Sequence, residues 1–248
     1  MSETPLETNL NYLKLPYIRK NLDLLTQQAT EKQWSFTQYL RTLIEGEVQL
    51  RLDNKVARRI GAARFPVIKS MESFDWSWPK KINQAQVQEL LQLRFLEEKA
   101  NVILLGGVGL GKSHLATAIG YAACLQGHSV LFSSAVDIIN TLATAHATHQ
   151  LKRALRKYLS PTVLIMDELG YLPIDKAGAD LLFQVISERY EKGSIILTTN
   201  QPYKKWPRIF NNDATLTSAV LDRLLHHAHT VTVQGRSYRM KGQITEPE

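Results

Sequence analysis

A glycine-rich loop, GGVGLGKS at residues 106–113, constrains the fold of this chain more than any other stretch. It follows the apolar run VILLG and precedes a run from Lys112 to Gln126 that reads as a helix. Glycines let backbone N–H groups turn toward phosphate oxygens, and the start of a helix adds a partial positive charge. The pattern Gly-x-x-x-x-Gly-Lys-Ser between a buried strand and a helix therefore predicts a phosphate-binding loop. A dinucleotide fingerprint is excluded, because Lys112 stands where its third glycine would be.

The same loop predicts a nucleoside triphosphate with a magnesium ion. Lys112 can reach the β- and γ-phosphates, and the hydroxyl of Ser113 can bind Mg²⁺. The alternative is a flexible glycine turn with a chance lysine, and the agreement of strand, motif and helix argues against it. We expect the nucleotide to be bound by the loop and the residues that open the helix, namely Gly106, Gly107, Val108, Gly109, Leu110, Gly111, Lys112, Ser113 and His114.

Polar residues end two further apolar strands. Asp167 and Glu168 follow the run VLIM, where Asp167 can hold Mg²⁺ through water and Glu168 can act as a general base on the attacking water. A base there favours hydrolysis over transfer to a second substrate, and the lack of an Asn-Lys-x-Asp guanine motif favours ATP. Asn200 ends the run IILTTN, where it can orient the water or sense the γ-phosphate. The alternative for Asn200 is a cap on the loop before Pro202.

A single arginine interrupts the apolar helix predicted near residues 217–227. One interpretation of Arg223 is a local ion pair with Asp222. The other is an arginine finger, which stabilises transition-state charge on ATP bound by a neighbouring subunit. The second interpretation requires a homo-oligomer.

Strand and helix patterns alternate over residues 84–248, which predicts an α/β domain with a parallel sheet flanked by helices. A single helix over 84–99 opens this domain. Residues 1–64 read only as helices, one of them running from 35 through 59, and predict a small all-α domain that binds DNA or a partner. Residues 65–83 contain two prolines and four aromatics, which predicts an ordered linker.

The formal net charge of +7 favours a polyanionic partner, first nucleic acid and then an anionic membrane. Two basic groups are candidate DNA contacts, one in a predicted helix and one near the end of the N-terminal helices: Lys152, Arg153, Arg156 and Lys157, and Arg58, Arg59 and Arg64. The alternatives are a solvated helix face for the first group and a solvated helix end or a protein–protein surface for the second.

The other chemistry-bearing residues predict no additional site. The single cysteine, Cys124, lies in an apolar helical setting that is typical of a core. His226, His227 and His229 resemble a metal-binding group, but no cysteine or carboxylate set completes it. The acidic N-terminus lacks the apolar segment of a signal peptide, and no run is long enough to cross a membrane. We therefore expect a cytoplasmic protein that does not bind a membrane.

Together these motifs resemble an AAA+ ATPase, with Walker A at 106–113, Walker B at Asp167 and Glu168, sensor 1 at Asn200 and a box VII-like arginine at Arg223. Within this class the chain is similar to the IstB-like ATPases of bacterial insertion sequences, in a group that also contains DnaC-like helicase loaders. The stretches ARFP…SFDW, DELGYLP and DRLLHH…SYR carry this resemblance more specifically than the Walker motifs do.

The resemblance implies a small helical domain before an AAA+ core that has no or only a minimal C-terminal lid. Arg236 and Arg239 are then candidates to replace the usual sensor 2 arginine. It also implies an ATPase that forms a homo-oligomer with ATP on duplex DNA and assists a cognate transposase. The alternative is a DnaC-like replicative helicase loader, which would favour single strands. A nucleotide kinase is a third possibility, and the predicted base at Glu168 argues against it.

Overall fold

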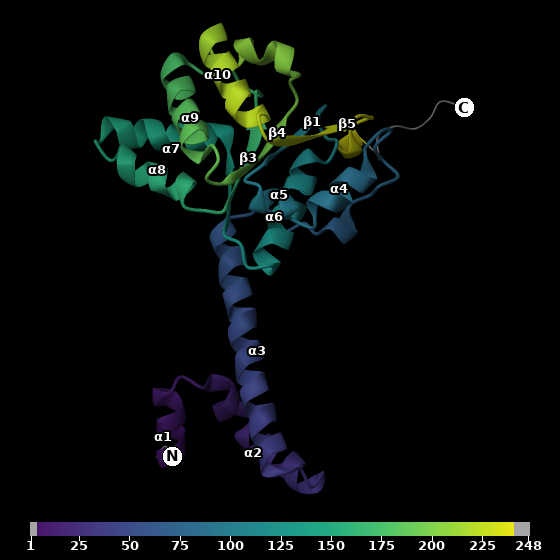
Figure 1. Ribbon diagram of the computed structural model, residues 1–248, viewed down its shortest axis with the longest axis vertical. Helices are drawn as coiled ribbons and strands as arrows, with labels where there is room; N and C mark the ends of the chain where they lie inside the picture. Colours follow the sequence, from purple (N-terminus) through teal and green to yellow (C-terminus); the bar gives the residue numbers. More distant parts are fainter. Residues whose placement is uncertain (1–3, 241–248) are drawn as a thin grey trace. The chain divides into compact units, whose positions relative to one another are not determined.

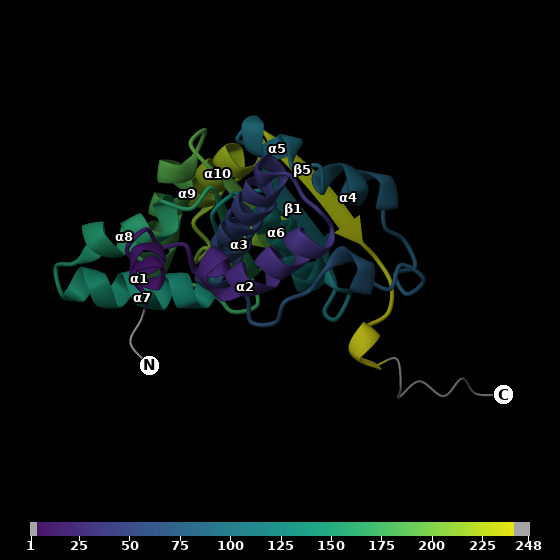
Figure 2. The same cartoon turned by 90° about the horizontal axis from the view of Figure 1, so that it is seen from below.

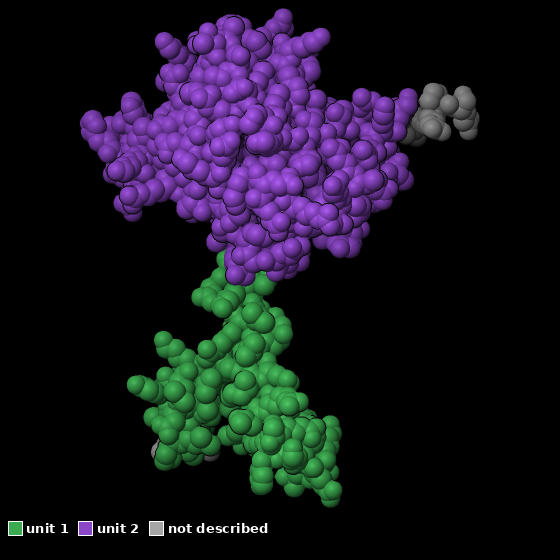
Figure 3. Space-filling model, in the orientation of Figure 1, with its two compact units in different colours: residues 1–58 green, residues 59–248 purple. Residues whose placement is uncertain are grey.

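The structure is a computed structural model that describes residues 4–240. The chain forms two compact units, residues 1–58 and residues 59–248 (Figure 3). The division lies within the long helix α3 (Phe36–Ala63), and the segment 65–83 belongs to unit 2. The outermost residues of the two expected domains, 1–3 and 241–248, lie outside the described part of the chain.

Unit 1 consists of helices, as the sequence predicts. It contains α1 (Pro5–Tyr12), α2 (Pro16–Glu31) and most of α3. Thr4 begins α1 with a capping box, because its hydroxyl accepts from the N–H of Glu7 while the Glu7 carboxylate accepts from the N–H of Thr4. The small core of this unit is formed by Leu10, Ile18, Leu25 and Leu43.

Helix α3 is longer than predicted, and several of its large apolar side chains are exposed. It ends at Ala63 rather than at Arg59, because residues 60–63 continue the helix into unit 2. Its periodic apolar residues are also mostly exposed: Leu43 is 6% exposed, whereas Phe36 is 94% exposed. The core of unit 1 therefore covers only one side of the helix.

Unit 2 is built on a sheet of five parallel strands in the order β2-β3-β4-β1-β5. The strands have apolar runs because both faces of the sheet are covered. Their bounds are β1 (Asn101–Gly106), β2 (Val130–Ser134), β3 (Val163–Leu169), β4 (Ser194–Thr199) and β5 (Ala228–Val233). Strand β1 lies between β4 and β5. The glycine-rich loop that follows β1 therefore starts at the carboxyl edge of the sheet, between these two neighbouring strands.

Helices cover both faces of this sheet (Figures 1 and 2). One face packs against the linker and against α4 (Gln84–Leu90), α5 (Arg94–Glu97) and α6 (Lys112–Leu125). The other packs against α7 (Ala135–Ala147), α8 (Leu151–Leu159), α9 (Lys176–Arg189), η2 (Tyr203–Arg208) and α10 (Ala214–Leu225). The linker contains one short turn, η1 (Met71–Ser73).

The single helix predicted over 84–99 is wrong. It is broken into α4 and α5 at Leu93, whose backbone is left-handed with φ 62°. The side chain of Leu93 is buried, with 3% of it exposed. A helix cannot continue through a residue with a left-handed backbone, so it ends before Leu93.

The predicted fold class is confirmed by the parallel sheet, its flanking helices and the helical N-terminal region. Within the described residues the chain after β5 forms only the short turn η3 (Tyr238–Met240), and no helical lid. None of the described helices combines the length and the hydropathy that a membrane crossing requires.

Candidate active site

The phosphate-binding loop joins β1 to α6 at the carboxyl edge of the sheet. Gly109 and Gly111 have φ values of 72° and 83°, in the left-handed region that side chains disfavour. Gly111 is also the residue that precedes α6, and a Cβ atom there would lie 2.7 Å from the ring of Phe74. The loop therefore needs glycine at 111 both for its backbone conformation and for its contact with the linker.

Lys112 lies under this loop and is only 5% exposed. Its Nζ donates to the carbonyl of Gly107 over 2.6 Å, which holds the ammonium group within the loop. Burial lowers the pKa of Lys112, while Asp167 and Glu168 oppose this shift and favour the charged form. The two carboxylates thus help to keep a cation at the position where phosphate charge would be bound.

Asp167 is bound by hydroxyl groups from two different elements. Ser113 donates to its Oδ1 over 2.8 Å, and Thr198 of β4 donates to the same oxygen over 2.6 Å. Asp167 is 8% exposed. The structure thus brings together Ser113 and Asp167, the two residues predicted to hold Mg²⁺. A hydroxyl and a carboxylate are hard oxygen ligands of the kind this ion prefers, so these side chains fit it.

Thr198 is a residue of this site that the sequence alone did not predict. Besides its bond to Asp167, its Oγ1 accepts from the backbone N–H of Glu168 over 2.9 Å. Thr198 therefore holds both carboxylate residues in position. Its polar side chain in an apolar strand is the feature that could have indicated this role, because a buried polar group needs a hydrogen-bond partner. The partner comes from β3, the strand that pairs with β4.

Glu168 leaves the regular geometry of its strand. Its φ is 62°, and the pairing of β3 with β4 shifts register between Met166 and Leu169. A non-glycine residue in this region costs about 1–3 kcal/mol, and such strain is concentrated at functional sites. The irregularity leaves Glu168 exposed on the wall of the cavity beside the phosphate-binding loop, whereas Asp167 stays buried.

Asn200 follows β4 and carries an unsatisfied acceptor. Its Oδ1 is buried and has no hydrogen-bond partner among the described residues. The turn after it is bonded by Thr199 instead, whose Oγ1 accepts from the N–H of Gln201 over 3.1 Å. A buried acceptor of this kind is normally satisfied by water or by a ligand. Its position after β4 thus fits a group that orients water.

A cavity of about 300 Å³ opens beside the phosphate-binding loop. Its other walls come from the linker and from the chain after β5, and they include Phe74, Trp78, Tyr238 and Arg239. Lys81 of the linker pairs with Gln234 through two backbone hydrogen bonds, which joins these two walls. The cavity has the size and the mixed aromatic and polar lining of a small-ligand site.

Two aromatic side chains fix the outer wall of the cavity. The rings of Trp78 and Tyr238 pack edge to face with centroids 5.6 Å apart, and the Trp78 indole donates to the carbonyl of Arg236 over 2.9 Å. The N–H of Tyr238 donates to the carbonyl of Gly109 over 2.8 Å. Trp78 and Tyr238 were not predicted to have a role in the site. Two sequence features could have indicated such a role. They are the cluster of aromatic residues between two prolines in the linker, and Tyr238 in the GRSYR stretch.

A match to a known protein family identifies the kind of protein that contains this site. Residues 8–245 match the family described as IstB-like ATP binding protein. The chain belongs to the IstB-like ATP-binding proteins. The resemblance predicted from the sequence is thereby confirmed, and ATP is the nucleotide of the family.

Relatives of this IstB-like protein are named for bacterial insertion sequences. A protein from Bacillus thuringiensis subsp. berliner, whose name links it to insertion sequence IS232 and to ATP binding, is 39% identical over 241 residues. The alignment covers 97% of this chain and 96% of the relative. A Pseudomonas aeruginosa protein named in the same way for IS21 is 40% identical over 236 residues, which is 95% of this chain and 89% of the relative.

Solved structures show that the IstB-like chain shares its fold with replication proteins. AMPPCP-bound DnaA from Aquifex aeolicus aligns with a TM-score of 0.58 and 22% identity, over 72% of this chain and 54% of that one. The DnaC helicase loader aligns with a TM-score of 0.55 and 20% identity, over 66% and 96%. This likeness shows the AAA+ P-loop fold.

His114 of the IstB-like chain contacts the linker. Its Nε2 lies 3.0 Å from the carbonyl of Ser70 and 3.2 Å from the Ser73 hydroxyl, and its ring packs edge to face on Phe74. His114 also lines the cavity. Its side chain therefore holds the linker against the start of α6, a role that differs from the phosphate contacts expected of the loop.

Arg223 does not line this cavity. It donates to the carbonyl of Ala219 in its own helix over 3.0 Å, and its guanidinium lies 4.9 Å from the ring centroid of Phe183. Among the described residues, Arg223 forms no ion pair with Asp222. A local ion pair therefore does not hold the Arg223 side chain in place. Of the two candidate sensor 2 residues, Arg239 lines the cavity, whereas Arg236 provides the carbonyl for Trp78.

The basic residues of α8 differ from one another in exposure. Leu155 and Tyr158 are buried, which turns Lys152, Arg153 and Arg156 to the surface. Lys157 is half-buried, with its ammonium 4.9 Å from the Tyr158 ring centroid and a bond to the Tyr158 hydroxyl. In the second candidate group the three residues are likewise unequal, since Arg58 and Arg64 are exposed and Arg59 is half-buried.

Proposed function

We propose that this IstB-like protein is a Mg²⁺-dependent ATPase that forms a homo-oligomer with ATP on duplex DNA and assists the transposase of its insertion sequence. The observation that carries the proposal is the match, over nearly the full length of both chains, to proteins named for insertion sequences. The ATPase part is supported by the hydrogen-bonded group of Ser113, Asp167, Thr198 and Glu168 beside a cavity, with Lys112 bonded to the carbonyl of Gly107 in the adjoining loop.

The chain's own residues supply each part of a hydrolytic step. Bound Mg²⁺-ATP would bring the phosphoryl group and the charge of the metal. Lys112 would neutralise β- and γ-phosphate charge, and Ser113 and Asp167 would hold the ion, Asp167 through water. Glu168 accepts a proton from water as the water oxygen bonds to the γ-phosphorus, and the bond to the ADP oxygen breaks.

Two further residues complete this mechanism. Asn200 orients the attacking water through its unpartnered oxygen. Arg223 stabilises charge on the ATP of a neighbouring subunit, because it lies away from the cavity of its own chain. The products are ADP and inorganic phosphate.

Helix α8 provides the DNA-binding surface in this proposal. Three exposed cations, Lys152, Arg153 and Arg156, lie on one side of a short helix whose other side is buried. Such residues bind phosphates without reading bases, so affinity should depend strongly on salt and little on sequence. Arg58, Arg59 and Arg64 are proposed as a second, weaker contact.

Fluorescence anisotropy on labelled duplex and single-stranded DNA, with and without Mg²⁺-ATP, tests this function. We expect ATP-dependent, cooperative binding that favours duplex. Replacing Lys152, Arg153 and Arg156 together by alanine should reduce the slope of log affinity against log salt by about 0.9 for each phosphate that the variant no longer neutralises. Lys157→Ala is the matched control within α8, and we expect a smaller change because its ammonium already contacts Tyr158.

The outcomes separate this function from the helicase-loader alternative. A preference for single strands, or loss of DNA binding when ATP is bound, would favour a DnaC-like loader. An unchanged salt slope in the triple variant would exclude α8 as the DNA-binding surface while leaving the ATPase assignment intact. The same measurement on Arg58→Ala with Arg64→Ala then tests the second group.

A further inference from the structure

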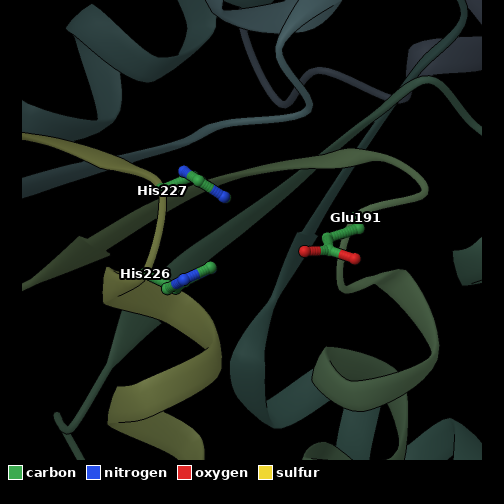
Figure 4. Close-up of side chains that lie close together, drawn as sticks. All are labelled: Glu191, His226 and His227. Carbon is green, nitrogen blue, oxygen red and sulfur yellow. The ribbon is translucent and has the colours of Figure 1, made fainter.

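The fold brings a carboxylate beside two adjacent histidines at the edge of unit 2. Glu191 follows α9, and His226 and His227 follow α10 (Figure 4). One ligand atom from each side chain lies within 4.8 Å of the others, and all three residues are exposed. From the sequence alone, no cysteine or carboxylate set completed a metal site with these histidines. The structure supplies that carboxylate from a different element and leaves His229 outside the group.

The positions of these side chains are supported by buried and hydrogen-bonded neighbours. Arg189, at the end of α9, is 2% exposed and donates to main-chain carbonyls, including those of Tyr158 and Ser194, each over 2.8 Å. It thus fixes the end of the helix from which Glu191 extends. The Tyr190 hydroxyl lies 2.9 Å from Nδ1 of His226. This bond orients the imidazole, so Nε2 is the nitrogen that would bind an ion.

We propose that Glu191, His226 and His227 form a binding site for a divalent transition-metal ion of the zinc type. Two imidazoles and one carboxylate are a known three-ligand set for Zn²⁺, with water in the fourth position. The Tyr190 hydroxyl would be the outer partner that metal-binding histidines normally have.

The spacing of the ligand atoms agrees with this assignment after small side-chain movements. Bonds of about 2.1 Å in a tetrahedral site separate the ligand atoms by about 3.4 Å. The present separations of up to 4.8 Å are therefore somewhat too long. All three side chains are exposed, so rotation about their side-chain torsions can close the difference without moving the backbone.

The surroundings favour a zinc-type ion over Mg²⁺ or Ca²⁺. A small pocket next to the cluster is lined by Glu191 and His227, and also by the cationic side chains Lys99 and Arg223. These positive charges disfavour an ion that is held by charge alone. Imidazole nitrogens form stronger bonds with Zn²⁺, Ni²⁺ or Cu²⁺ than with hard cations, so the ligand type decides the selectivity.

A bound ion would connect the end of α9 to the end of α10. His226 directly follows α10, the helix that contains Arg223. The ion would therefore restrict the movement of α10, whether or not ATP is present. This makes the site testable without any assumption about hydrolysis.

The test is Zn²⁺ binding to the full chain, freed of metal and without nucleotide, measured by competition with a chromophoric chelator. We expect one Zn²⁺ per chain. Loss of an outer partner of a metal site typically costs about 10–100-fold in affinity, so His226→Ala, His227→Ala and Glu191→Gln should each weaken binding by at least about tenfold, and Tyr190→Phe by about tenfold. His229→Gln is the matched control and should bind Zn²⁺ like the wild type.

Two other readouts keep the result independent of folding defects. Circular dichroism should show the same metal-free fold in every variant, since the three ligands are exposed. At a hundredfold excess over the dissociation constant, Zn²⁺ should raise the Tm of the wild type by about 5 °C or more, and that of the three ligand variants much less. Co²⁺ should give the visible absorption of a tetrahedral site in the wild type and in His229→Gln, but not in the three ligand variants.

Three results would overturn the proposal. They are no Zn²⁺ binding by the wild type, equal binding by the wild type and all three ligand variants, or loss of binding in His229→Gln with retention in Glu191→Gln. None of these results depends on ATP or DNA, so the proposed function would stand or fall separately.

Discussion

The carboxyl edge of the sheet and the end of α10 hold different parts of the proposed hydrolytic machinery, and they are organised differently. At the sheet edge, Ser113, Asp167, Glu168 and Thr198 are connected by hydrogen bonds of 2.6–2.9 Å beside the cavity. Arg223 instead bonds to a carbonyl of its own helix and lies outside the lining of that cavity. In the proposed mechanism, the groups for binding and proton transfer are thus assembled within one chain, while the transition-state cation is not.

This difference has a direct functional consequence. In the proposed mechanism a single chain binds ATP with residues that are already in place, but among the described residues Arg223 is not part of the cavity that Lys112 and Arg239 line. If Arg223 acts on a neighbour, hydrolysis depends on assembly whereas nucleotide binding does not. The two regions can therefore be separated by mutation.

Arg223→Ala should have the largest effect. We expect the hydrolysis rate of the assembled protein to fall on the order of 10⁴-fold, because loss of an arginine finger removes charge stabilisation only in the transition state. The affinity of the isolated chain for a fluorescent ATP analogue should stay the same. Steady-state phosphate release and analogue titration measure the two quantities.

Complementation shows in which subunit Arg223 acts. Mixing Arg223→Ala with Glu168→Gln creates interfaces where an intact Glu168 faces an intact Arg223 from the other variant. Activity should then reappear, although each variant alone is inactive. Mixtures that stay inactive at all ratios, while still assembling, would contradict action in trans.

Glu168→Gln should have the next largest effect, on the order of 10³-fold in the rate of hydrolysis, because the amide cannot accept the proton of the attacking water. ATP binding should be retained, since the bond from Glu168 N–H to Thr198 is made by the backbone. Glu188→Gln, a change at an exposed glutamate of α9, is the matched control. Normal turnover in Glu168→Gln would refute the assignment of the base.

The sequence predicted those parts of the molecule that depend on local pattern. The order of strands and helices follows from apolar periodicity, and the phosphate-binding loop follows from a fixed spacing of glycines before Lys112. Asp167 and Asn200 were predicted as site residues because each is a polar residue at the end of an apolar strand. The resemblance added the family, which the full-length match confirms.

The sequence could not predict contacts between distant segments. Thr198 became a site residue only through the pairing of β3 with β4, and Trp78 only because the linker packs beside the tail near Tyr238. The break in the helix over 84–99 depends on tertiary burial of Leu93, which local periodicity does not contain. Glu191 likewise meets His226 only in the folded chain.

Trp78→Ala should have the smallest effect, and it tests whether the outer wall of the cavity binds the nucleotide. A base stacked on an aromatic ring gains about 1–3 kcal/mol, so we expect ATP affinity to fall by about tenfold while the rate at saturating ATP changes little. Weaker binding with an unchanged rate is typical of an interaction made equally in the ground and transition states. Trp34→Ala, in unit 1, is the matched control. If Trp78→Ala bound ATP like the wild type, the aromatic wall would serve only to hold the linker and the tail together through Tyr238 and Arg236.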